Sequence, residues 1–321
     1  MESDMNRQHV IGYIMIFAAA LLFALIGPIS LFAMKEGVTP LETAFWRALF
    51  GGLCFGLHGA LIGAWRVTGR QRTILSLFGI PGVGILFFCY IYGVQYAGAA
   101  MTSVLNNTAP IWVAIWAWLF LREALTGSKI ASIILAVIGA GVISASGGGL
   151  DTGATTLGII AAAASGFLFS LHSLVAKKFL TENVSPVSIY MHILPVGALC
   201  MLPFVDFMPN KSLVAWSSLL AMGFLCNWVP YLCFCGALKR LPATRVSVLE
   251  TASEPFLSAL FAFMWWGEAF TTLGWLGTFL VMGAVVTVIL SKDKLRPAKT
   301  KRLGTRPEEQ PQEQPGKRAP V

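Results

Sequence analysis

The chain has 321 residues, of which 56% are apolar and only 12% are charged, and its mean hydropathy is +0.72. Soluble domains carry roughly 25% charged residues, so this composition excludes an ordinary soluble protein and predicts a polytopic membrane protein. The net charge of +8 comes from basic residues scattered between apolar spans and gathered in the tail. They form no stripe, which excludes a nucleic-acid partner.

Ten apolar spans follow one another along the chain, each near the ~20 residues that cross a bilayer. They are predicted at 10–34, 42–64, 73–95, 99–121, 128–146, 155–176, 186–206, 213–237, 244–267 and 271–290. The acidic start lacks a small-residue cleavage site, so we expect the first span to be retained. Residues 291–321 are rich in Lys, Arg, Pro, Glu and Gln and predict a disordered basic cytoplasmic tail.

The orientation follows from the distribution of basic residues between the spans. If the N-terminus is cytoplasmic, that side holds most of the 23 lysines and arginines, and the opposite side holds only Lys35 and Lys211. The positive-inside rule therefore places both termini in the cytoplasm.

One sequence unit occurs twice. Ala100–Thr126 and Ala243–Thr271 each contain SVL, then a proline, and a glutamate thirteen residues after that proline. At an offset of 146, EGVTP at 36–40 also matches ENVSP at 182–186. The first five spans, 10–146, therefore correspond to the last five, 155–290. Because five is odd, the second repeat must be inverted, which is typical of carriers.

Two carboxylates, Glu250 and Glu254, lie one helical turn apart inside the ninth span. Ionised groups are costly there and usually functional. Desolvation and mutual repulsion favour a proton on at least one of them, so they are candidates for proton coupling. The alternative for Glu254 is that it satisfies backbone groups freed by Pro255.

Polar and aromatic residues in other spans are candidates for binding a small-molecule substrate. They are Tyr90, Asn106, Asn107, Trp112, His172, Asn227 and Tyr231. Mixed linings of this kind suit amphipathic metabolites. For the aromatic residues the alternative is packing against lipid, and for His172 it is a hydrogen-bonded neutral ring.

Three further residues have structural interpretations that we favour. Arg47 lies inside the second span and could hold a substrate carboxylate, but we expect it to pair with Glu36, Glu42 or a carbonyl near the outer interface. Glu123 and Glu268 end the matched units. They could act in gating, through contacts that exist in only one of two states, but we expect helix-end carboxylates held by backbone or basic groups.

The two SVL…Pro…Glu units, the ALKRLPAT segment at 237–244 and the five-plus-five layout resemble the EamA-type branch of the drug/metabolite transporter superfamily. The resemblance covers residues 10–290 and implies a bacterial inner-membrane exporter of amino acids or other small metabolites without its own ATPase. Glu254-Pro255 and Gly267-Glu268 also look like the threonine and homoserine exporters of this branch. Asn106-Asn107-Thr108 stands where other members vary.

Other classes of function are disfavoured. The chain has no HExxH, GxSxG or P-loop lysine motif, so no enzyme is predicted. The six cysteines form no ligand-like pair, and neither a metal nor another cofactor is expected. A channel would more naturally form from a ring of identical subunits. The small-residue stretch Ala161–Gly166 indicates close helix packing or a homodimer contact.

We therefore predict an all-α integral membrane carrier of ten helices in two inverted repeats, which exports amino acids by alternating access in exchange for protons. Aromatic or cationic drug-like amphipathic compounds are the alternative substrates, because the lining offers aromatic rings and carboxylates.

Overall fold

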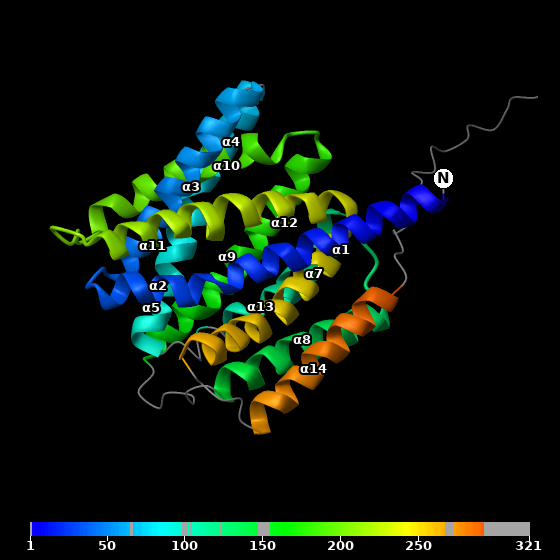
Figure 1. Cartoon of the computed structure of the whole chain (residues 1–321). Coiled ribbons are helices and arrows are strands. Elements are labelled where there is room, and N and C mark those ends of the chain that lie inside the picture. Colours follow the sequence, from blue (N-terminus) through cyan, green and yellow to red (C-terminus); the bar gives the residue numbers. More distant parts are fainter. Residues whose placement is uncertain are drawn as a thin grey trace, which may run out of the picture.

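The computed structural model describes residues 2–64, 67–97, 102, 105–121, 123–146, 155–266 and 272–291, and these are almost entirely helical (Figure 1). The first half contains α1 (Glu2–Ala24), α2 (Ile26–Lys35), α3 (Pro40–Ile62), α4 (Gly69–Gly79), η1 (Ile80–Ile85), α5 (Leu86–Ala97), α7 (Ala109–Phe120) and α8 (Gly127–Ser146). The second half contains α9 (Thr156–Thr181), α10 (Pro186–Met201), η2 (Leu202–Phe204), α11 (Leu213–Gly223), η3 (Phe224–Trp228), α12 (Val229–Arg240), α13 (Ala243–Trp266) and α14 (Thr272–Leu290).

Seven helical stretches within the described residues are long and apolar enough to cross a membrane. They are Arg7–Lys35, Pro40–Ile62, Gly69–Gly93, Thr156–Thr181, Pro186–Phe204, Leu213–Arg240 and Thr272–Leu290. Two shorter apolar helices, Ala109–Phe120 and Gly127–Gly139, lie within the predicted fourth and fifth spans, and α13 covers the predicted ninth. The all-helical membrane fold is therefore confirmed, and a count of ten crossings stays a prediction.

The repeated EGVTP and ENVSP segments form the same turn. Gly37 and Asn183, which correspond at the offset of 146, have φ angles of 94° and 61°. Thr39 and Ser185 then accept hydrogen bonds from the amides of Glu42 and Ser188, and a proline opens each helix. A left-handed residue, a hydroxyl cap and a proline at the first helical position thus begin α3 and α10 alike.

Within the described part of the chain, two helices contain π-helical segments, which the sequence did not predict. η1 joins α4 to α5 in the third predicted span, and η3 joins α11 to α12 in the eighth. These two spans correspond in the repeat. A π-helical segment inserts an extra residue into a helix and is frequently found at functional sites.

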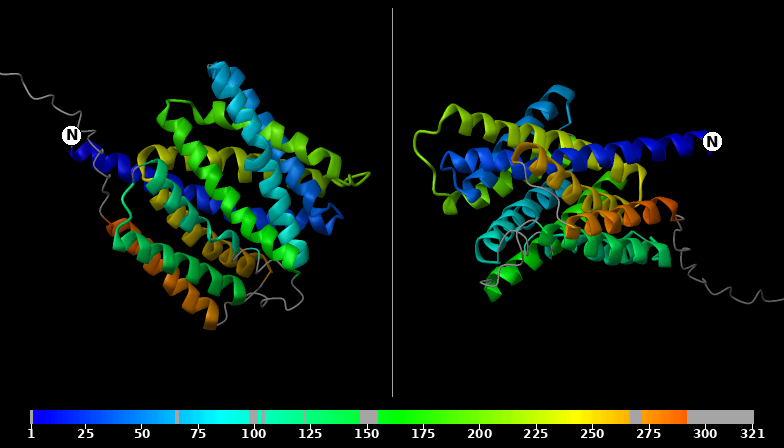
Figure 2. Two further views of the ribbon diagram at one scale, coloured as in Figure 1. Left: turned by 180° about the vertical axis from the view of Figure 1, so that it is seen from behind. Right: turned by 60° about the horizontal axis from the view of Figure 1, so that its bottom comes forward.

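The most extensive helix pairs join one half of the chain to the other. They are α8 with α14, α5 with α9, α3 with α10 and α1 with α12. In Figure 2, α8 and α14 lie side by side in both views, along one flank of the bundle. The apolar core therefore belongs to both halves together.

Glycines allow the closest approaches between these helices. A Cβ atom at Gly79 would lie 2.5 Å from the carbonyl oxygen of Ile193 on α10. At Gly166 it would lie 2.7 Å from the Leu105 oxygen and 2.9 Å from the Asn106 oxygen. The stretch Ala161–Gly166 is thus used for packing within the chain, while a homodimer contact stays a prediction.

We expect Gly79→Ala to lower the free energy of unfolding by about 1–3 kcal/mol, because the added methyl group meets backbone that cannot rotate away. Gly56→Ala on α3 is the matched control, since a Cβ atom there has nothing within 4 Å. Helix propensity predicts that this control stabilises the protein by up to about 1 kcal/mol. Heating detergent-solubilised protein and measuring the monodisperse fraction ranks the two variants. Equal midpoints would contradict the role assigned to Gly79.

Candidate functional site

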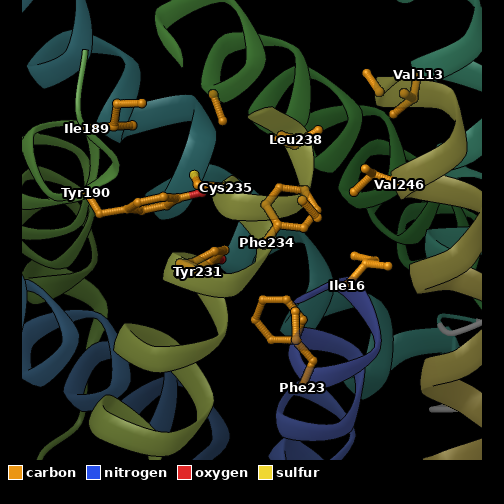
Figure 3. Packing of buried hydrophobic residues seen from close by; sticks show 14 of the residues in the cluster. Ile16, Phe23, Val113, Ile189, Tyr190, Tyr231, Phe234, Cys235, Leu238 and Val246 are labelled. Carbon is orange, nitrogen blue, oxygen red and sulfur yellow. The ribbon is translucent and has the colours of Figure 1, made fainter. Parts of the chain in front are cut away.

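A stack of buried rings lies at the centre of the bundle (Figure 3). Tyr190 on α10 and Tyr231 on α12 stack with their centroids 4.3 Å apart, and His172 on α9 stacks on Tyr231 at 5.4 Å. Phe23 on α1 contacts Tyr231 edge-on at 5.3 Å. Helices of both halves therefore meet at this stack. The stack brings together two of the predicted substrate-binding residues, His172 and Tyr231. Tyr190 was not among the predicted residues, although it is the one tyrosine of its predicted span.

Both ring nitrogens of His172 are occupied. Nδ1 lies 2.9 Å from the carbonyl oxygen of Gly82 in η1, and Nε2 lies 3.0 Å from the hydroxyl of Tyr190. A carbonyl oxygen can only accept, so Nδ1 carries the proton and Nε2 accepts from Tyr190. The ring is 1% exposed. His172 is hydrogen-bonded at both ring nitrogens and ties the stack to the π-helical segment η1, while its role in substrate binding stays a prediction.

Glu250 lies close to this stack. It is 3% exposed on α13 and lies within electrostatic range of the Tyr190 hydroxyl. That hydroxyl also points toward Cys235 (Figure 3). The side chain of Glu254 and all of Glu268 lie outside the described residues. One of the two predicted proton-coupling carboxylates is thus buried beside the aromatic centre.

Two of the remaining candidates of the first half contact α9. Asn106 accepts a hydrogen bond from Ser165 at 3.0 Å, and Trp112 packs edge-on against Phe167 at 5.4 Å. Asn107 is 7% exposed. Tyr90 and Trp112 are more open, each 36% exposed. Asn106 and Trp112 therefore contact α9, whereas Tyr90 and Asn107 are placed here only by their exposure.

Asn227 lies in another group, with Arg47. Its amide nitrogen donates to the Arg47 carbonyl oxygen at 2.8 Å, and the Arg47 guanidinium donates to the Cys226 carbonyl oxygen at 3.1 Å. Arg47 thus contacts a carbonyl, one of the partners expected for it. Glu42, another, pairs instead with Lys211 at 2.6 Å.

Buried polar contacts surround Glu123 and Lys129 at one end of the bundle. Glu123 accepts from the amide of Ala243 at 2.7 Å and from the Thr244 hydroxyl at 3.0 Å, and it lies 3.7 Å from the Lys129 ammonium. Its carboxylate therefore holds the N-terminus of α13, where negative charge is favourable. The structural interpretation of Glu123 is confirmed.

The opposite end carries a second buried ion pair. The ammonium of Lys211 bonds to Glu42 and lies 5.2 Å from the Trp216 ring and 5.7 Å from the Trp46 ring. The amide of Met208 also donates to Glu42 at 3.0 Å. This pair ties the link between α10 and α11 to the start of α3.

A cavity of 290 Å³ lies nearby and is entirely apolar. Its lining residues are Leu41, Ile80, Gly84, Ile85, Phe88, Cys200, Met201 and Phe204. Because it offers no polar atoms, it does not suit a polar metabolite. Within the described ranges, no cluster of three or more His, Cys, Asp or Glu residues could hold a metal ion.

Comparison with known proteins gives a consistent set of transporters. The sequence model described as the EamA-like transporter family matches twice, over residues 10–145 and 156–290. The chain is 26% identical to an uncharacterized transporter of Clostridium kluyveri, over 88% of this chain and 94% of that protein. It is 25% identical to the uncharacterized inner membrane transporter YicL of Salmonella typhimurium, over 87% and 95%.

One relative has a substrate in its name. A probable terminal-alkyne amino-acid exporter of Streptantibioticus cattleyicolor is 23% identical, over 75% of this chain and 81% of that protein. A solved crystal structure matches with a TM-score of 0.74 at 21% identity, covering 89% of this chain and 97% of its own. That likeness concerns the fold. The named relatives are transporters rather than enzymes.

Proposed function

Because the chain belongs to the EamA-like transporter family, we propose that it exports amino acids or similar small metabolites across the bacterial inner membrane in exchange for protons. The proposal includes ten crossings, two inverted repeats of residues 10–146 and 155–290, and both termini in the cytoplasm. Alternating access by two similar halves is the mechanism that such a repeat supports.

The observation that carries the proposal is the buried polar and aromatic centre between the halves. His172, Tyr190, Tyr231 and Glu250 come from four helices, and Phe23 adds a contact from the first half. Ionisable groups in such a place mark pathways for substrates or protons. Glu250, with Glu254 one turn away, is the proposed proton carrier.

Substrate contacts are proposed for the predicted lining residues: Tyr90, Asn106, Asn107, Trp112, His172, Asn227 and Tyr231. The Streptantibioticus relative, a probable amino-acid exporter, supports amino acids as the first compounds to test. Contacts at Glu123 and at Glu42 lie at the two ends of the bundle, and alternating access requires them to rearrange in turn.

Counterflow in proteoliposomes tests this function. Vesicles preloaded with one unlabelled amino acid are diluted into the same labelled compound, and empty liposomes provide the background. We expect saturable, transient accumulation of the label for at least one amino acid. Folded, inserted protein that exchanges none of the twenty would contradict amino-acid export. The same assay with aromatic cationic compounds then tests the alternative substrates.

A further inference from the structure

Buried polar atoms without hydrogen-bond partners occur along the contact between α3 and η3. Arg47 Nε, His58 Nδ1, Asn227 Oδ1 and Trp228 Nε1 are each buried without a hydrogen-bond partner among the described residues. We name these four residues the polar seam. Leaving a buried polar atom unpaired costs on the order of 1–3 kcal/mol. These four unpaired atoms therefore call for a ligand or water that completes their hydrogen bonds.

The local backbone explains why a cation lies here. Pro230 has no amide hydrogen, so it cannot donate the i+4 helical hydrogen bond to the carbonyl of Cys226. Arg47 supplies a donor to this carbonyl from α3. Gly51 lets the Asn227 amide reach α3, since a Cβ atom there would lie 2.4 Å from its nitrogen.

This structural role uses only part of the guanidinium group. Arginine has five N–H donors, and the contact with Cys226 occupies one nitrogen, Nη2. The guanidinium carbon lies 5.1 Å from the centre of the Phe87 ring on α5, and the group lies within electrostatic range of His172. Arg47 is therefore directed toward the centre between the halves, and it remains partly accessible.

No acidic side chain forms an ion pair with Arg47 within the described parts of the chain. Glu42, just over one helical turn earlier, is committed to Lys211. The seam thus offers the Arg47 cation, which has free donors, beside Asn227. Asn227 is 0% exposed, and its side-chain oxygen accepts no hydrogen bond from the described residues. A carboxylate is the matching ligand group for the Arg47 guanidinium, and an N–H group is the matching donor for the Asn227 oxygen.

We propose that the polar seam is the subsite for the carboxylate of the transported compound, with Arg47 binding the anion and Asn227 accepting from an N–H group next to it. This rests on the proposed transport function and specifies its substrates as compounds with a carboxylate beside an amine. Charge-assisted hydrogen bonds to a planar guanidinium give the strength and direction that such recognition needs.

Isothermal titration of purified protein in nanodiscs tests the subsite. The probes are L-threonine, L-leucine and L-phenylalanine, each compared with its own carboxamide. We expect at least one acid to bind about 10- to 100-fold more tightly than its amide, the range expected for hydrogen bonds to a charged group. An amide that binds as tightly as its acid, or binding by no acid, would overturn the proposal.

Arg47→Lys separates binding from folding. Lysine can still donate to Cys226, so we expect an unchanged elution profile, but it lacks the planar fork. Affinity for the acid should fall at least about tenfold and affinity for the amide should not change. Arg240→Lys is the matched control, because Arg240 also donates to a carbonyl, that of Gly236, at 2.9 Å. Wild-type affinity in Arg47→Lys would exclude the subsite.

Counterflow with the same six compounds distinguishes this subsite from the transport function. Exchange of amides as fast as acids would keep the transporter and overturn the carboxylate subsite. If an acid binds in a way that depends on Arg47 but is not exchanged in counterflow, the carboxylate subsite would stand and the transport function would be contradicted. Exchange of acids alone, lost in Arg47→Lys, is the result that we expect.

Discussion

Glu250→Gln is expected to abolish proton-driven accumulation of substrate while the protein still folds and inserts. One unit of pH corresponds to about 1.4 kcal/mol, so exchange for one proton sustains a roughly tenfold substrate gradient per unit. Glutamine is nearly isosteric with glutamate but carries no titratable proton. The variant should therefore reach a concentration ratio of about one under the same pH gradient, because nothing couples the two flows.

The measurement uses proteoliposomes with a pH difference of one unit and a substrate identified by counterflow. Counterflow itself needs no net proton movement, so Glu250→Gln should retain exchange and lose its pH dependence. Glu182→Gln is the matched control, since Glu182 lies exposed at the end of α9. Unchanged pH dependence in Glu250→Gln would remove Glu250 from the coupling mechanism.

Glu123→Ala is expected to cause the largest loss of stability. The substitution leaves the Lys129 ammonium, 1% exposed, without its anion, and it removes the acceptor of the first amides of α13. Removing one partner of a buried ion pair typically costs about 3–5 kcal/mol. We expect the midpoint of thermal unfolding to fall by roughly 10 °C.

The double variant Glu123→Ala, Lys129→Met tests the cause of this loss. If the unpaired ammonium dominates, the double variant will be more stable than the sum of the two single effects predicts. Glu182→Ala serves as the exposed control and should change stability by less than about 0.5 kcal/mol. Strict additivity would show that the lost helix cap, rather than the charge pair, is responsible.

The sequence predicts the helices well because local signals define their ends. Thr39-Pro40 and Ser185-Pro186 combine a cap with a proline at the first helical position, and both begin helices in the structure. Glu123 was predicted as a helix-end carboxylate, and it contacts backbone amides and Lys129. These features depend on neighbouring residues or on apolar length, which the sequence displays directly.

The site was only partly predictable, because its contacts join distant segments. Arg47 and Cys226 are 179 residues apart, and η3 becomes visible only from backbone hydrogen bonds, since hydropathy does not report the phase of a helix. The signal for Arg47 was present as the one basic residue deep in a span. Glu42, which was expected as a partner of Arg47, forms its ion pair with Lys211 instead. The sequence alone does not show which of the two cations lies nearer to Glu42 in the fold.

The pairing of helices across the two halves has a consequence for how the protein is made. Helices α1, α3, α5 and α8 find their most extensive neighbours in α12, α10, α9 and α14, all of which are synthesised later. The faces of α1, α3, α5 and α8 that pack against these partners therefore remain uncovered until the second half of the chain has been made. The glycine contacts and the Glu123 cap form only then, so the finished carrier assembles late, as a single unit.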